Sequence, residues 1–193
     1  MKTVFTAGVV LAIAGTASAT ELQKVLMVDL SVPNQVTISA TDGLAAVDAS
    51  GSDSIGVYFE NFYAGAGNAL SGVLVSGDIT NAENPSDNTP SIFRAGGGTD
   101  TGLNMWSWSS DSIVTFTAGS LAFTGSGTWT LSADMYADMV AGGEREGELY
   151  FAADDASDLP DAVVIGGWCV VIPTPGTAGL LGLAGFAAVR RRR

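Results

Sequence analysis

The sequence predicts an all-β fold, an antiparallel β-sandwich or jelly roll, with an N-terminal signal helix and a C-terminal apolar helix at its two ends. Three observations predict this fold class. Apolar residues in the middle of the chain recur mostly with a period of two, which is the period of half-buried strands. Turn residues interrupt them at a spacing of roughly 8–12 residues. No stretch shows the longer period of a convincing amphipathic helix.

Residues 1–19 are predicted to be a cleaved signal peptide. Lys2 precedes the apolar run 4–15, and Ala17 and Ala19 form a small-residue cleavage site that makes Thr20 the mature start. The run is too short to span a bilayer. Signal peptidase is therefore an expected partner, and an uncleaved anchor is the alternative.

Residues 20–171 are predicted to form the β-domain. Residues 81–90 are polar with two prolines and are expected to be a loop, whereas 132–143 is the one stretch with a helix-forming composition. The expected strands are, in order, 24–32, 35–40, 54–63, 71–80, 91–95, 103–110, 112–118, 120–125, 127–136, 147–153 and 162–172.

This segment is strongly acidic. It holds all 20 acidic residues of the chain but only three basic ones, Lys24, Arg94 and Arg145, so its formal charge is −17. Such a charge repels nucleic acid, which we do not expect as a partner. It also favours solubility and attracts divalent cations.

The residue types argue against an enzyme. The chain has no histidine, which excludes the usual serine and cysteine nucleophile systems and histidine-containing zinc sites. A hydrolase that uses two carboxylates is the remaining catalytic alternative. Glu144, Glu146 and Glu148 are its candidates, although a charged turn before a strand explains the same pattern.

Four aspartates form the densest acidic cluster: Asp154, Asp155, Asp158 and Asp161. Calcium takes six to eight oxygen ligands, and a loop of close aspartates supplies several. The spacing is not that of an EF-hand loop. The alternatives are therefore a calcium site and a solvated loop without a cofactor.

Trp106 and Trp108 stand two residues apart and share one face of a predicted strand. Facing outward, they would form a stacking platform for a sugar, which makes a secreted glycan-binding module the alternative function. Facing inward, they would fill the core, and the alternating serines favour this second orientation. Cys169 is the only cysteine and is expected to be a small buried apolar residue.

The C-terminal segment, residues 172–193, has three parts in a set order. Pro173, Thr174 and Pro175 begin it, an uncharged stretch through residue 189 follows, and Arg190, Arg191, Arg192 and Arg193 end it. Residues 172–189 would make a helix of roughly 27 Å, enough to cross a thin membrane. The arginines would remain on the cytoplasmic side. A plain membrane anchor is the alternative.

This order of parts resembles the PEP-CTERM sorting tail of exported bacterial proteins, in which the motif is usually Pro-Glu-Pro. The resemblance is confined to the tail. It implies recognition by an exosortase-type membrane enzyme, at least transient membrane anchoring, and delivery to the cell surface or to an exopolysaccharide-containing matrix. The expected function is a non-enzymatic structural or adhesive surface protein.

Overall fold

A computed structural model describes residues 22–65, 67, 70–72, 74–85, 90–94, 100–106 and 113–172, and these residues form a mostly β structure. The strands are β1 (Lys24–Asp29), β2 (Gln35–Ala40), β3 (Ala49–Ser52), β4 (Val57–Phe59), β5 (Leu70–Gly72), β6 (Leu74–Gly77), β7 (Thr80–Asn81), β8 (Ile92–Arg94), β9 (Leu103–Met105), β10 (Ile113–Phe116), β11 (Phe123–Thr124), β12 (Ser126–Thr130), β13 (Glu146–Phe151) and β14 (Val163–Val171). The single described helix is α1 (Ala133–Ala141).

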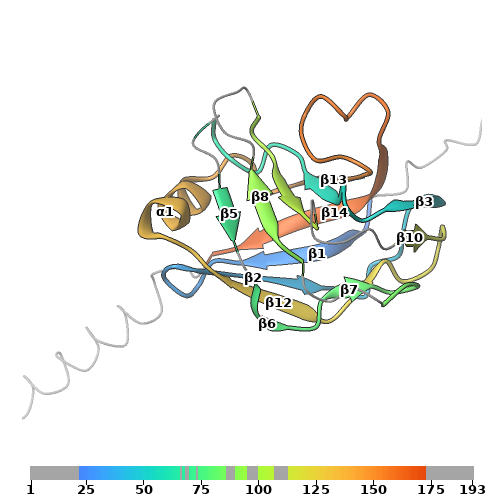
Figure 1. Cartoon of the computed structure of the whole chain (residues 1–193), viewed down its shortest axis with the longest axis horizontal. Helices are drawn as coiled ribbons and strands as arrows, with labels where there is room; N and C mark the ends of the chain where they lie inside the picture. The colour runs from blue at the N-terminus through green and yellow to red at the C-terminus, as the bar shows by residue number, and fades with distance from the viewer. Residues whose placement is uncertain are drawn as a thin grey trace, which may run out of the picture.

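Ten of these strands form one curled sheet in the order β5-β8-β9-β4-β13-β14-β1-β2-β12-β6 (Figure 1). Two short pairs, β10-β3 and β11-β7, accompany it. The edge strands β5 and β6 are separated by one residue in the sequence. Because the chain passes directly from one edge of the sheet to the other, the sheet must curl on itself as a half-barrel does.

The sheet is mixed, which corrects the expectation of a purely antiparallel one. Strands β1 and β14 pair in parallel, whereas every other described strand pair is antiparallel. The pairing joins the first and last described strands, so no local sequence signal could reveal it. The jelly-roll topology remains a prediction.

The period-two pattern explains the inner strands. In β2, Val36 and Ile38 are fully buried, while Thr37 lies on the opposite face and shares a hydrogen bond of 2.9 Å with Thr128 of β12. Strand β14 instead has a continuous buried run, residues 165–168, in the middle of the sheet. Strands that have neighbours on both sides and are covered on both faces show continuous buried runs of this kind.

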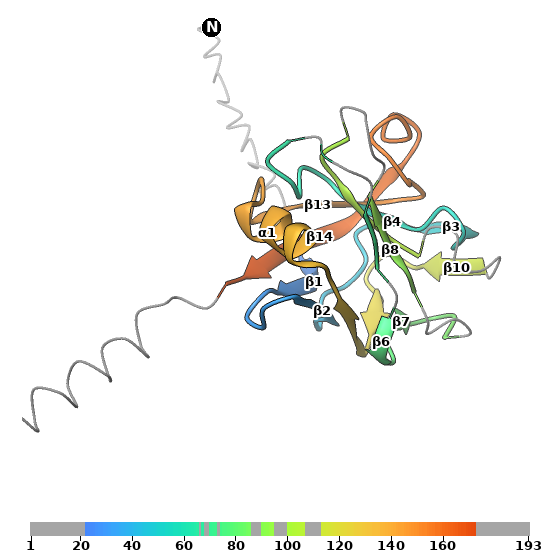
Figure 2. The same ribbon diagram turned by 60° about the vertical axis from the view of Figure 1, so that its left-hand side comes forward.

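Helix α1 begins where strand 127–136 was expected to continue. Ser132 caps it by accepting a hydrogen bond from the Met135 N–H at 3.2 Å, and Gly142 ends it with a positive φ of 37°. Asp134 lies in the first turn, where a negative charge interacts favourably with the positive end of the helix dipole. Met139 is buried, so the helix covers one end of the curled sheet, opposite the β3-β10 pair (Figures 1 and 2).

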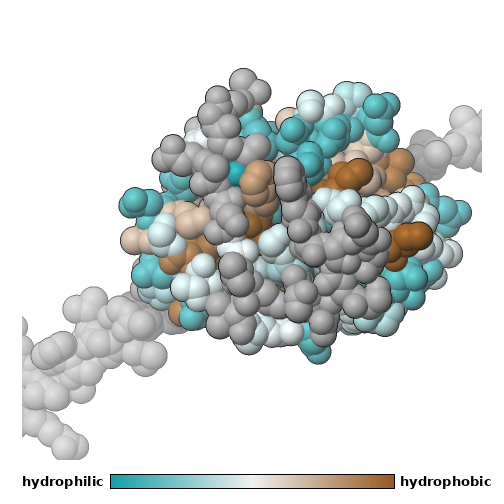
Figure 3. All heavy atoms as spheres, in the orientation of Figure 1, coloured by the Kyte–Doolittle hydropathy of each residue, from teal (hydrophilic) through white to brown (hydrophobic). Residues whose placement is uncertain are grey.

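The core contains the two largest buried side chains, Trp129 and Trp168. Their indole N–H groups donate to the backbone carbonyls of Pro90 at 2.9 Å and Glu148 at 3.0 Å, so neither polar group is left unsatisfied. Cys169, beside Trp168, is half-buried rather than buried. On the face shown in Figure 3, the coloured surface is largely hydrophilic with separate apolar patches.

Candidate functional site

The acidic loop, residues 152–162, connects β13 to β14 (Figure 1, orange). Asn104 of β9 ties its start to the sheet, because the side-chain amide donates to the carbonyls of Ala153 at 2.7 Å and Ile55 at 2.9 Å. Further along, the Ala162 N–H donates to the Asp158 carbonyl at 3.1 Å. The Asn104 bonds therefore hold the start of the loop to the sheet, and the Ala162 bond closes a turn at its end.

Three of the four predicted aspartates converge in this loop. One ligand oxygen from each of Asp154, Asp155 and Asp158 lies within 4.8 Å of the other two. The turn is closed by the Asp154 N–H, which donates to Asp158 Oδ2 at 3.0 Å, and by Ser157, whose N–H and hydroxyl both donate to Asp155 Oδ1. Asp161 is outside this group but lines the same open depression, which has a volume of about 320 Å³.

The crowded carboxyls titrate differently. Partial burial, together with a hydrogen bond to Asp158 and the negative charges of Asp158, Asp155 and Asp100, raises the pKa of Asp154 to about 6. The pKa of Asp158 is lowered, mainly because the Asp154 N–H stabilises its charged form. The pair therefore holds a proton at a pH at which separate aspartates are ionised.

A polar cluster lies near the loop. The Tyr58 hydroxyl donates to Asp100 Oδ1, and the Gly102 N–H donates to the same oxygen at 3.0 Å. Asp100 is only 7% exposed, and its second oxygen has no hydrogen-bond partner in the described structure. Burial and this hydrogen bond raise the pKa of Tyr58, so the phenol stays a donor. This cluster was not predicted, since 42 residues separate Tyr58 from Asp100.

The chemistry of the acidic loop suits a hard divalent cation. Its three converging carboxylates are oxygen ligands of the kind that calcium takes, although calcium needs more than three and would complete its shell with carbonyls or water. The carboxylates also repel one another, and a cation would relieve this repulsion. Asp154, Asp155 and Asp158 are the residues that could hold it, with Asp161 at the rim.

Trp106 lies in the core. It is 3% exposed and stacks on Phe123 with ring centroids 5.8 Å apart, so it offers no face to a sugar. Trp108 lies outside the described residues. The structure therefore places Trp106 in the inward orientation that the serine alternation favoured.

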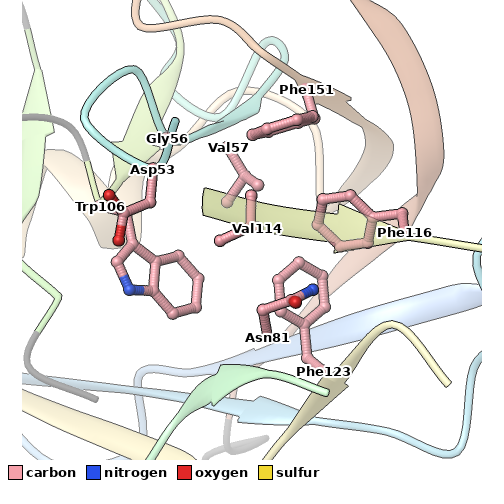
Figure 4. Close-up of a pocket in the computed structure, with 9 residues that line it drawn as sticks. All are labelled: Asp53, Gly56, Val57, Asn81, Trp106, Val114, Phe116, Phe123 and Phe151. Carbon is pink, nitrogen blue, oxygen red and sulfur yellow. The ribbon is translucent and has the colours of Figure 1, made fainter. Parts of the chain in front are cut away.

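A small pocket lies beside Trp106 (Figure 4). Its volume of about 10 Å³ is the room that one water molecule needs. It is thus too small for a metabolite. The lining residues are Asp53, Gly56, Val57, Asn81, Trp106, Val114, Phe116, Phe123 and Phe151.

A cleft at Arg94 was not predicted either. The side chain of Arg94 is 2% exposed, and its guanidinium forms an ion pair of 3.0 Å with Asp138 of α1 and lies 4.0 Å from the Tyr63 ring centroid. These residues line an open cleft of about 200 Å³. In the sequence, the scarcity of basic residues in the domain was the feature that could have drawn attention to Arg94. Its contacts fasten α1 to β8.

The three glutamates considered for hydrolysis are on or near β13. Glu146 forms an ion pair of 3.2 Å with Lys24, and Glu148 accepts a hydrogen bond of 2.6 Å from Tyr150. Burial and the charges of Glu148 and Glu144 raise the pKa of Glu60 nearby. The acidic-loop depression, the pocket beside Trp106 and the Arg94 cleft are lined by other residues.

The predicted terminal sites lie outside the described residues. They are Ala17, Ala19 and Thr20 at the signal, Pro173, Thr174 and Pro175 at the motif, and Arg190, Arg191, Arg192 and Arg193 at the end. Among the residues that are described, no helix has both the length and the hydrophobicity of a membrane span.

Comparisons of the chain with protein-family models, with curated proteins and with solved structures find no match.

Proposed function

We propose that the chain is an exported structural or adhesive protein of the cell surface or extracellular matrix, sorted through a PEP-CTERM-like tail. The proposal includes removal of the N-terminal signal by signal peptidase and recognition of the tail by an exosortase-type enzyme. It assigns no catalytic residues to the β-domain.

The way in which the domain ends supports this proposal. Strand β14 enters the core at Ile165 and Trp168, which are fully buried, but Val171 is 44% and Ile172 is 38% exposed. The chain therefore reaches the surface directly before Pro173. A processing enzyme would therefore reach the chain at the end of β14 without unfolding of the domain.

The acidic surface is consistent with an extracellular role. Its charge keeps the domain soluble and away from anionic lipid headgroups, so the tail is the proposed contact with the membrane. The burial of Trp106 removes one half of the aromatic platform on which the glycan-binding alternative depended.

The decisive experiment is mass measurement of both ends of the mature protein in the producing cell. We expect a start at Thr20 and loss of the segment after the Pro173-Thr174-Pro175 motif in the surface fraction. Deleting Arg190 to Arg193 should leave the protein stalled or move it to the medium, whereas Asp42→Asn, on the exposed domain surface, is the matched control. An intact C-terminus and unchanged fractionation of the deletion variant would refute the sorting proposal.

A further inference from the structure

Strands β1 and β14 lie side by side in the middle of the sheet and run in the same direction (Figures 1 and 2). Their register pairs Lys24 with Gly167, Met27 with Cys169 and Asp29 with Val171. Beyond these pairs, the Gly167 N–H donates to the Gln23 carbonyl at 2.8 Å, and the Leu30 N–H donates to the Val171 carbonyl at 3.2 Å.

This arrangement places the two ends of the domain at opposite ends of one ladder. The chain enters β1 beside Gly167 and leaves β14 beside Asp29. Tension between the termini would therefore slide the two strands past each other and load their hydrogen bonds together. If both attachment points lay at the same end of the ladder, the bonds would instead open one after another.

The surroundings of the ladder increase its resistance to sliding. Leu26, Val28, Ile165 and Trp168 are fully buried, so water cannot readily replace a hydrogen bond that is stretched. The side chain of Val25 in β1 also packs directly over Gly166 of β14, since a Cβ on Gly166 would lie 2.6 Å from Val25 Cγ1.

Strand β14 is also the strand that carries the tail. Its nine residues make it the longest described strand, and it is bonded to β13 on one side and to β1 on the other. A pull on the C-terminal end of β14 is thus transferred along two ladders into both halves of the sheet.

From this geometry we propose that the domain is a load-bearing element, in which the parallel β1-β14 ladder is a mechanical clamp against tension along the chain. The inference rests on the proposed function only for the source of the load, which is attachment of the mature chain to the surface at its C-terminal end. The clamp itself is a property of the folded domain.

Single-molecule force spectroscopy of the full chain tests the clamp. One arm pulls between handles on the two termini. The second arm pulls between the C-terminal handle and a thiol at Val32→Cys, an exposed position that follows β1, at the end of the ladder where β14 leaves. Both arms carry Cys169→Ala, so that the only other thiol is removed.

We expect an unfolding force at least about twofold higher in the first arm at the same loading rate, because bonds loaded together share the force. Gly166→Ala should lower the force in the first arm, and Gly65→Ala, whose Cβ would meet no atom within 4 Å, should not. Equal forces in the two arms would overturn the clamp without affecting surface sorting. If the sorting proposal failed, the ratio of unfolding forces between the two arms would not change. The two proposals can therefore be refuted independently.

Discussion

The hydroxyl of Tyr58 donates a hydrogen bond to the buried carboxylate of Asp100, and this bond joins β4 to the segment that leads into β9. Tyr58→Phe should therefore lower the free energy of unfolding by about 1–3 kcal/mol, because a buried charged acceptor loses a donor. Urea unfolding measures the change. Tyr150→Phe removes a hydrogen bond to exposed Glu148 and should cost less than about 0.5 kcal/mol. Equal costs for the two variants would contradict the importance assigned to Asp100.

Gly102 is required by the close approach of the Tyr58 ring. A Cβ at this position would lie 1.9 Å from Tyr58 Cζ, so Gly102→Ala must displace the phenol from Asp100. We expect a loss of about 2 kcal/mol or more, as overpacking in a core causes. Gly65→Ala meets no atom within 4 Å and is the matched control. A thermal or urea midpoint of Gly102→Ala equal to that of Gly65→Ala would exclude the predicted clash.

The pKa of Asp154 predicts how stability depends on pH. Since its pKa is raised to about 6 in the folded state, protonated Asp154 stabilises the fold at low pH, and this contribution is lost as the pH rises through 6. The pKa of Asp158 is lowered, so ionised Asp158 stabilises the fold at higher pH. This stabilisation is lost only as the pH falls through the folded-state pKa of Asp158, which lies below the ordinary 3.8. Asp154→Asn should therefore become more stable relative to the native sequence between about pH 4 and pH 7.

Urea unfolding across this pH range provides the measurement. Asp161→Asn, which removes a charge from the same loop but not from the three-carboxylate cluster, serves as the comparison. If the free energies of unfolding of the native sequence and of Asp154→Asn changed in parallel with pH, the raised pKa of Asp154 would be refuted.

The prediction of calcium at the acidic loop has its own test. Calcium at ten times its dissociation constant should raise the free energy of unfolding by about 1.4 kcal/mol, because it binds only the folded loop. Asp158→Asn should remove this shift, and Asp42→Asn, at an exposed position outside the loop, should keep it. A shift that survives Asp158→Asn, or no shift at any calcium concentration, would leave the solvated loop as the correct alternative.

The sequence predicted the strands whose apolar residues alternate or form a dense run. Strands β1, β2 and β14 fall within 24–32, 35–40 and 162–172, because burial on one or both faces leaves a local pattern. Strand β3, Ala49–Ser52, was missed because its small and polar residues show no such pattern. The predicted strand 127–136 extends into what is helix α1 in the structure. Ser132 and Asp134 are residue types typical of a helix start.

The candidate site was predictable only where its residues are close in sequence. The aspartates of the acidic loop were found because they lie within eight residues. The contacts Tyr58–Asp100 and Arg94–Asp138 join residues 42 and 44 positions apart, and the parallel pairing of β1 with β14 joins residues still more distant. Such contacts are determined by the topology of the sheet, and one sequence contains no local record of them.

The central position of β14 also has a consequence for biogenesis. Without this strand, the sheet order falls into a group from β5 to β13 and a group from β1 to β6, with no shared neighbour between them. A chain that emerges N-terminus first supplies β14 after every other described strand, so the core cannot close until synthesis of the domain is almost complete. If the chain is exported as proposed, it would remain unfolded during its passage across the membrane, and the arrival of β14 would complete the sheet afterwards.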